Sequence, residues 1–254
     1  MEQRVLVTAG ASGIGKEIAK AFAANGAKVC VCDIDEAALE QAASDIPGLI
    51  TKVCDVSKRQ DIERMVADSV DALGGLDVLV NNAGISGPTA PVAELDPDAW
   101  EKVMQVDLTG TFNVTRLAIP HLKKSEAGVI IVMSSVAGRF GYANRSPYCT
   151  AKWGLIGLTK TLAIELGPSG IRANAILPGA VGGARIEKVF EGRAQATHKP
   201  LDEIRREALA AQSIKRFVDP RDIAALAVFL ASDAAKSISG QMLLIDNDMQ
   251  TTGG

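Results

Sequence analysis

The stretch SVAGRFGYANRSPYCTAK, Ser135–Lys152, decides how the rest of this 254-residue sequence is interpreted. It opens with a serine at the end of an apolar run and contains Tyr148 and Lys152, four residues apart. On a helix this spacing places both side chains on one face. A free tyrosine is only about 0.1% ionised at neutral pH. An ammonium about 5 Å away stabilises the phenolate by roughly 3 kcal/mol at an effective dielectric near 20, so the pair predicts a tyrosine base.

A glycine-rich turn near the start of the chain adds a second motif. Tyr-x-x-x-Lys also occurs by chance on surface helices, so the pair alone is not diagnostic. Here the strand-like run RVLVT, residues 4–8, precedes AGASGIG and the helical pattern KEIAKAFAANG. Strand, glycine turn and helix in this order are typical of dinucleotide binding, because backbone N–H groups and the helix N-terminus favour a pyrophosphate.

An aspartate follows the second predicted strand. The run KVCVCDID reaches Asp33, 18 residues after Gly15. A carboxylate at this point accepts hydrogen bonds from ribose hydroxyls and repels a 2′-phosphate, which favours NAD over NADP. Asp33 or Asp35 is also a suitable N-cap for the next helix, and both roles can hold at once.

These motifs, with NNAG at residues 81–84, resemble the short-chain dehydrogenase/reductase family over essentially the whole length of the chain. The resemblance implies an α/β fold: a doubly wound, Rossmann-type parallel sheet of about seven strands in the order 3-2-1-4-5-6-7. It implies one domain over residues 1–254, with a substrate-binding lid at about 180–216. It also implies that Ser135, Tyr148 and Lys152 are catalytic.

The resemblance further implies a set of NAD contacts at the carboxyl ends of the strands. The residues are Ser12, Gly13, Ile14, Gly15, Asp33, Asp55, Val56, Asn82, Gly84, Tyr148, Lys152, Pro178 and Val181. Two positions depart from the family pattern. Ala9 replaces the first glycine of the turn and permits the same close approach if its φ is negative. Gly183 replaces a threonine, so one side-chain contact to the cofactor is missing or comes from elsewhere.

A third departure concerns catalysis. The segment Asp98–Lys124 reads as one long helix, bent at Pro120, and its phrase VDLTGTF has Asp107 where the family has a catalytic asparagine. Aspartate can hold the same water but carries a negative charge. At about 8 Å and an effective dielectric near 40, this charge offsets roughly 1 kcal/mol of the lysine's stabilisation of the phenolate. The alternative is that a nearby base neutralises Asp107.

Three arginines flank the predicted site. Arg139, Arg145 and Arg185 could bind an anionic substrate, or they could be solvated surface charge. The predicted function is NAD-dependent hydride transfer between nicotinamide and a secondary alcohol or ketone, such as a small polyol, a sugar or an anionic hydroxy compound. The alternatives are an NADPH-linked 3-oxoacyl reductase and a non-catalytic NAD-binding protein.

The composition and charge of the chain exclude several other classes of protein. A net charge of −3 gives no reason to expect a nucleic-acid partner, and the four cysteines lack the spacing of a metal site. No apolar run approaches the roughly 20 residues of a membrane span, and a predicted strand leaves no room for a signal peptide. We therefore expect a cytoplasmic protein with a small-molecule substrate, no metal and no membrane or nucleic-acid partner. The resemblance implies a homotetramer.

Overall fold

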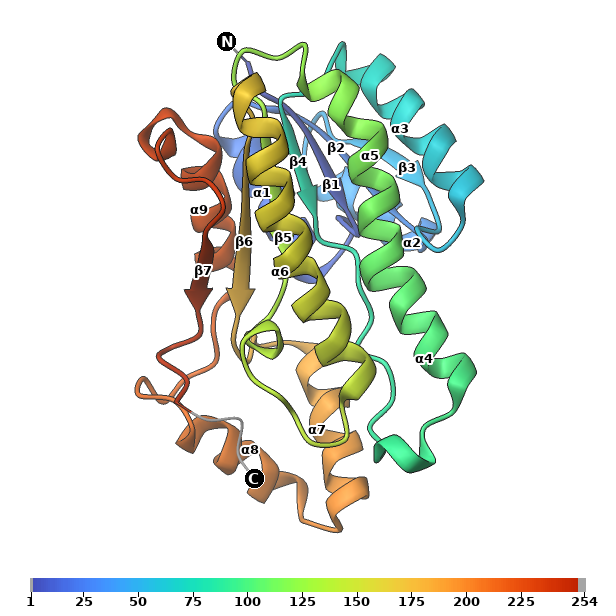
Figure 1. The fold of residues 1–254 in the computed structure, drawn as a ribbon, viewed down its shortest axis with the longest axis vertical. Helices are drawn as coiled ribbons and strands as arrows, with labels where there is room; N and C mark the ends of the chain where they lie inside the picture. Colours follow the sequence, from blue (N-terminus) through green and yellow to red (C-terminus); the bar gives the residue numbers. More distant parts are fainter. Residues whose placement is uncertain (1, 251–254) are drawn as a thin grey trace.

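The computed structural model describes residues 2–250, which contain one seven-stranded parallel sheet in the predicted order β3-β2-β1-β4-β5-β6-β7 (Figure 1). The strands are β1 (Arg4–Thr8), β2 (Lys28–Asp33), β3 (Ile50–Val53), β4 (Val78–Asn81), β5 (Val129–Met133), β6 (Arg172–Pro178) and β7 (Met242–Ile245). In the central pairs, Val5 is in register with Val29 and Val78. Runs of β-branched residues suit such strands because helices cover both faces of the sheet.

Six helices form the two covering layers (Figure 1). One layer contains α1 (Gly13–Ala24), α2 (Glu36–Asp45) and α9 (Pro220–Ala231), and the other contains α3 (Arg59–Leu73), α5 (Thr111–Leu122) and α6 (Ser146–Leu166). Alternate strand residues enter opposite cores, so Val7 belongs to the same core as Phe22 while Leu6 belongs to the other core with Leu155. Cys30 and Cys32 lie two residues apart in β2 and therefore face the same side, where both are buried in the second core.

The long helix predicted from Asp98 to Lys124 is divided into three parts. It consists of α4 (Pro97–Val103), a π-helical segment (Met104–Gly110) and α5. Pro120 lies inside α5, and the irregularity is instead the wider turn around Asp107. π-helical turns are often found at functional sites, and this one places Asp107 in the interior, fully buried.

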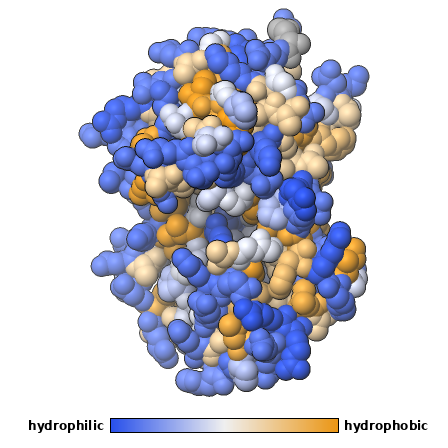
Figure 2. Space-filling view, turned by 180° about the vertical axis from the view of Figure 1, so that it is seen from behind, coloured by the Kyte–Doolittle hydropathy of each residue, from blue (hydrophilic) through white to orange (hydrophobic). Residues whose placement is uncertain are grey.

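Two helices lie beyond the carboxyl ends of the strands, at the bottom of Figure 1. They are α7 (Ala184–Thr197) and α8 (Leu201–Ala210), which share an apolar cluster that includes Phe190, Ile204 and Ala208. The cluster is separate from the two cores of the sheet, and the surface is hollowed between this part and the body (Figure 2). Short 3-10 helices occupy Val92–Glu94, Val136–Gly138, Gly167–Ser169 and Asp233–Ala235. Among the helices of residues 2–250, none combines the length and apolar character needed to cross a membrane.

Candidate active site

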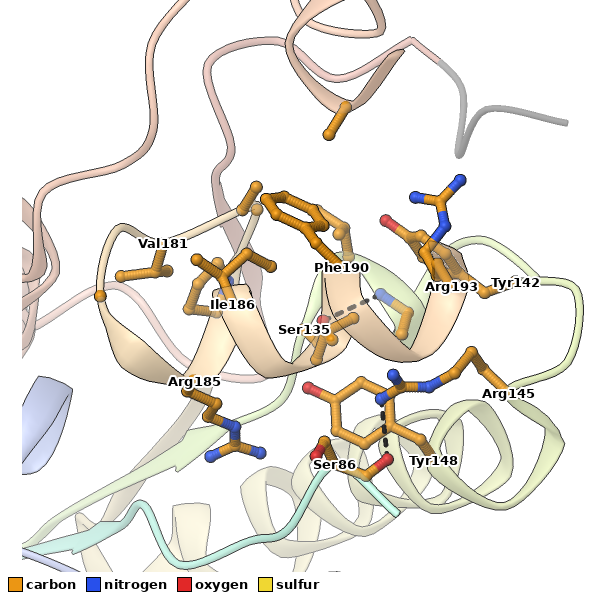
Figure 3. A pocket seen from close by; sticks show the side chains of 18 of the residues that line it. Ser86, Ser135, Tyr142, Arg145, Tyr148, Val181, Arg185, Ile186, Phe190 and Arg193 are labelled. Carbon is orange, nitrogen blue, oxygen red and sulfur yellow. Dashed lines mark hydrogen bonds between the residues drawn. The ribbon is translucent and has the colours of Figure 1, made fainter. Parts of the chain in front are cut away.

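A cavity of about 620 Å³ lies between the carboxyl ends of the strands and the helices α7 and α8 (Figure 3). The sheet edge supplies one wall, because parallel strands bring their carboxyl ends together. Most of the predicted site residues line this cavity: Ser12, Gly13, Ile14, Asp33, Asn82, Gly84, Ser135, Arg145, Tyr148, Lys152, Pro178, Val181 and Arg185. Five predicted residues, Gly15, Asp55, Val56, Asp107 and Arg139, are not in its lining.

The glycine-rich turn differs from its predicted geometry at Ala9. The close approach was expected at negative φ, but Ala9 has φ +49°, in the left-handed region that favours glycine. Asn82 supports this conformation, because its side-chain amide donates to Ala9 O at 3.0 Å and to Thr8 O at 3.1 Å. Gly15 packs tightly behind the turn, where a Cβ would lie 2.2 Å from Ala9 O. Asn82 and Gly15 therefore hold the turn open toward the cavity.

The carboxylate of Asp33 is placed at the end of β2 by backbone groups. Its Oδ1 accepts hydrogen bonds from Ile34 N at 2.8 Å and Asp35 N at 3.3 Å, and its Oδ2 accepts from Ala11 N at 3.3 Å. The capping role belongs to Asp35, which accepts from Ala38 N at the start of α2. Asp33 is therefore free of the capping role and lines the cavity beside the glycine turn.

The tyrosine and lysine lie one turn apart on α6, as predicted. Lys152 is buried, with Nζ 5.5 Å from the centroid of the Tyr148 ring and donating to Met133 O at 3.1 Å. Ser135 follows β5, and its Oγ accepts from Ala137 N at 3.1 Å. The main chain of Lys152 is tied to the same strand end, because Ser134 Oγ donates to Lys152 O at 2.9 Å. Ser135, Tyr148 and Lys152 thus meet at one end of the cavity.

Asp107 lies directly behind this group. Its Oδ1 accepts from Ile85 N at 2.7 Å, and its Oδ2 lies 3.6 Å from Lys152 Nζ with no hydrogen-bond partner in the described chain. Gly84 covers the pair, because a Cβ there would lie 3.2 Å from both charged atoms. The base beside Asp107 is therefore Lys152 itself, so the carboxylate partly offsets the lysine's charge on Tyr148.

Replacing Asp107 with asparagine tests this electrostatic contact. Asparagine keeps an acceptor for Ile85 N but removes the negative charge, so more of the Lys152 charge acts on Tyr148. We expect the alkaline-rising limb of the pH–rate profile to move to lower pH. An unchanged limb, with the variant folded, would show that Asp107 does not influence the base.

The arginines divide into two groups. Arg139 is exposed, stacks on Phe140 at 4.9 Å and is not brought to the cavity. Arg145 and Arg185 do line it, as does Arg193 of α7, which was not predicted (Figure 3). Ser86 and Tyr142 were also missed. Ser86 lies two residues after the end of NNAG, and this proximity could have indicated it, whereas Arg193 is one of several basic residues in a charged helix.

The wall after β6 explains one departure from the family pattern. Gly183 precedes α7 as its N-cap and has φ +136°, which L side chains rarely adopt. A threonine is therefore poorly suited to this position, and Val181, which bridges to Val218, lines the cavity without that contact.

The fold and the site define an oxidoreductase that uses a dinucleotide. A family model described as enoyl-(acyl carrier protein) reductase matches residues 8–249. The chain is 39% identical over 246 residues to D-beta-hydroxybutyrate dehydrogenase of Cupriavidus necator, with 95% of each chain covered. It thus belongs to the short-chain dehydrogenase/reductase family, whose members move hydride between a nicotinamide cofactor and a secondary alcohol or ketone.

Solved structures agree with this assignment. A variant of actinorhodin polyketide ketoreductase with NADPH matches with a TM-score of 0.93 and 32% identity, over 98% of each chain. An NAD⁺-bound xylitol dehydrogenase matches with a TM-score of 0.93 and 29% identity, over 96% of this chain and 97% of that one. One carries NADPH and the other NAD⁺, so the fold alone leaves the choice of cofactor open.

The residues present fit a nicotinamide dinucleotide. Gly13 has φ +52°, and a Cβ there would meet nothing within 4 Å, so backbone is presented to open space at the start of α1. Asp33 supplies a carboxylate for hydroxyl groups on one side of that turn, and Tyr148 and Lys152 line the other end of the same cavity. In the described part of the chain, no group of three or more His, Cys, Asp or Glu residues could hold a metal ion.

Proposed function

We propose that the protein is an NAD-dependent dehydrogenase that interconverts a small secondary hydroxy compound and its ketone. The observation that carries the proposal is one cavity that is lined both by the Asp33 carboxylate at the end of β2 and by Ser135, Tyr148 and Lys152 beyond β5, on the far side of β1 and β4. The carboxylate favours ribose hydroxyls over a 2′-phosphate. We assign the cofactor contacts predicted above to the same site, with Gly15 and Asn82 as supports of the turn and Asp55 and Val56 beyond β3, next to the adenine.

In this proposal Tyr148 is the general base of oxidation and the general acid of reduction. When bound, nicotinamide supplies the acceptor or donor of hydride. The phenolate of Tyr148 takes the proton of the substrate hydroxyl, and Ser135 Oγ donates a hydrogen bond to the substrate oxygen as its charge develops. Lys152 stabilises the phenolate and binds the nicotinamide ribose. Asp107 positions the lysine, and its negative charge reduces the effect of the lysine's positive charge on the phenolate. The lid, residues 180–216, closes the substrate end.

A coupled test compares cofactors with one set of alcohols. The purified protein is assayed for reduction of NAD and of NADP with neutral polyols, sugars and short hydroxy acids. We expect turnover with NAD at least about 100-fold above NADP in kcat/KM, because the half-buried Asp33 carboxylate would lie beside the negatively charged 2′-phosphate of NADP. Preference for NADPH with 3-oxoacyl thioesters would favour a carrier-linked reductase instead. Binding of NAD without any turnover across the panel would favour a non-catalytic role.

We further propose a homotetramer in a reducing, cytoplasmic compartment. Phe112 on α5 and Trp153 and Ile164 on α6 are large apolar side chains exposed on one layer, which is the kind of surface that subunit contacts cover. All four cysteines are free thiols within the protein, as expected where thiols stay reduced.

A further inference from the structure

Arg145 is a buried cation beside the proposed base. Only 6% of the residue is exposed, and its guanidinium carbon lies 5.1 Å from the centroid of the Tyr148 ring. Its Nη2 donates to Ser86 O at 2.7 Å, while Nε is buried with no partner in residues 2–250. Burying a charge without a partner of opposite sign is costly. The position therefore calls for an anion from outside the protein, or for some other compensating charge.

Within residues 2–250, no carboxylate forms an ion pair with Arg145. Burial lowers its pKa, and the groups that act on its charge are Tyr148, Cys149, Arg185 and Tyr142, none of them an acid of the Asp or Glu type. Apart from Arg185, the other cations of the cavity lie near carboxylates. Lys199 pairs with Glu203 and Glu207 on α8, and the charge of Arg193 helps to lower the pKa of Glu207, after the larger effect of Lys199. Arg145 and Arg185 thus leave excess positive charge near Tyr148.

We propose that the substrate is a short hydroxy acid whose carboxylate binds to Arg145 while its hydroxyl lies between Ser135 and Tyr148; this rests on the proposed function. The guanidinium lies against the ring of Tyr148, so the acid and the reacting carbon are separated by only a few bonds. Guanidinium groups pair well with carboxylates. Ile186 and Phe190 (Figure 3), together with Met249, are apolar residues in the lining of the cavity, which suits a short aliphatic backbone rather than a polyol.

Arg145 has one competing role, which is to stabilise the phenolate of Tyr148 directly. That role predicts an equal loss for every alcohol and a rising limb of the pH–rate profile displaced to higher pH when the charge is removed. Binding of a substrate acid predicts a loss confined to acids. The two roles are therefore separated by comparing an acid with its neutral ester.

The test uses 3-hydroxybutyrate and methyl 3-hydroxybutyrate with NAD, for the wild type, Arg145→Gln and Arg145→Lys. We expect the wild type to prefer the acid, and Arg145→Gln to lower kcat/KM for the acid by about 100-fold or more and for the ester by less than about 5-fold. Arg145→Lys should restore part of the loss for the acid only. Arg139→Gln removes the same charge from the same loop but outside the cavity, and should leave the acid preference unchanged.

A binding measurement tests the proposed acid site without relying on turnover. Calorimetry with malonate, an unreactive acid, on Tyr148→Phe saturated with NAD should show binding that Arg145→Gln abolishes in that background. A wild type that oxidises the ester or polyols as well as the acid would overturn the acid site while leaving the proposed function intact. Equal loss for acid and ester in a folded Arg145→Gln protein would assign Arg145 to Tyr148 alone. No turnover of any alcohol would instead contradict the proposed function.

Discussion

Replacing Tyr148 with phenylalanine is expected to lower kcat at least about 1,000-fold while leaving the affinity for NAD within about threefold. The substitution removes one oxygen and leaves the ring between Arg145 and Lys152, at 5.1 Å and 5.5 Å from its centroid. A positioned acid or base contributes roughly 10²- to 10⁴-fold. The loss should therefore fall on proton transfer rather than on cofactor binding.

Tyr142 provides a matched control for this prediction. It is the other of the two tyrosines of the chain, lines the same cavity and donates its hydroxyl to Met249 Sδ at 3.3 Å. Burial raises the pKa of Tyr142, so its phenolate is disfavoured and it is a poor base. We expect Tyr142→Phe to retain kcat within about tenfold. Stopped-flow rates measure kcat and calorimetry measures NAD affinity. Equal losses in the two variants would mean that packing, and not the Tyr148 hydroxyl, sets the rate.

The sheet could be predicted because the sequence patterns of its strands are local and are repeated along the chain. Each strand is a short apolar run that ends where a polar or glycine motif begins, so the strand order followed once the family resemblance was made. The same holds for Tyr148 and Lys152, whose geometry depends only on helix spacing. Asp33 and Asp35 show the limit of such signals. Both are residue types that suit an N-cap, and only the structure shows that Asp35 caps α2.

Features that depend on one extra residue in a helical turn, or on packing between distant parts of the chain, could not be predicted from the sequence. The π-helical turn at Met104–Gly110 has the composition of an ordinary helix, and its effect is to aim Asp107 inward at Lys152. The positive φ of Ala9 depends on Asn82, which is 73 residues away in the sequence. Arg139 and Arg145 are the same residue type in the same loop, so the sequence does not distinguish them. Their burial separates them, because α6 begins just after Arg145 and turns that side chain inward.

The charge at Asp33 is expected to set the preference for NAD, and reversing it should change the ratio of kcat/KM for NAD to that for NADP by about 1,000-fold. The variant is Asp33→Ser combined with Ile34→Arg. Serine removes the negative charge but keeps an acceptor for the backbone N–H groups that Asp33 now binds. Ile34 is 65% exposed, so an arginine there costs little packing and can meet a 2′-phosphate. Hydrogen bonds to a charged group contribute about 1.5–3 kcal/mol, which gives roughly one to two decades for each change.

Asp35→Ser distinguishes direct contact from a general effect of net charge. Asp35 carries the same charge two residues away, accepts from Ala38 N at 3.0 Å as the cap of α2, and does not line the cavity. Serine is also a good N-cap, so this variant should keep its stability as well as its preference for NAD. Steady-state kinetics with both cofactors measure the ratio. If Asp35→Ser shifts the ratio as far as the Asp33 variant does, the preference for NAD reflects the overall negative charge near β2. If only the Asp33 variant shifts it, the carboxylate that the backbone holds at the end of β2 discriminates the two cofactors by contact.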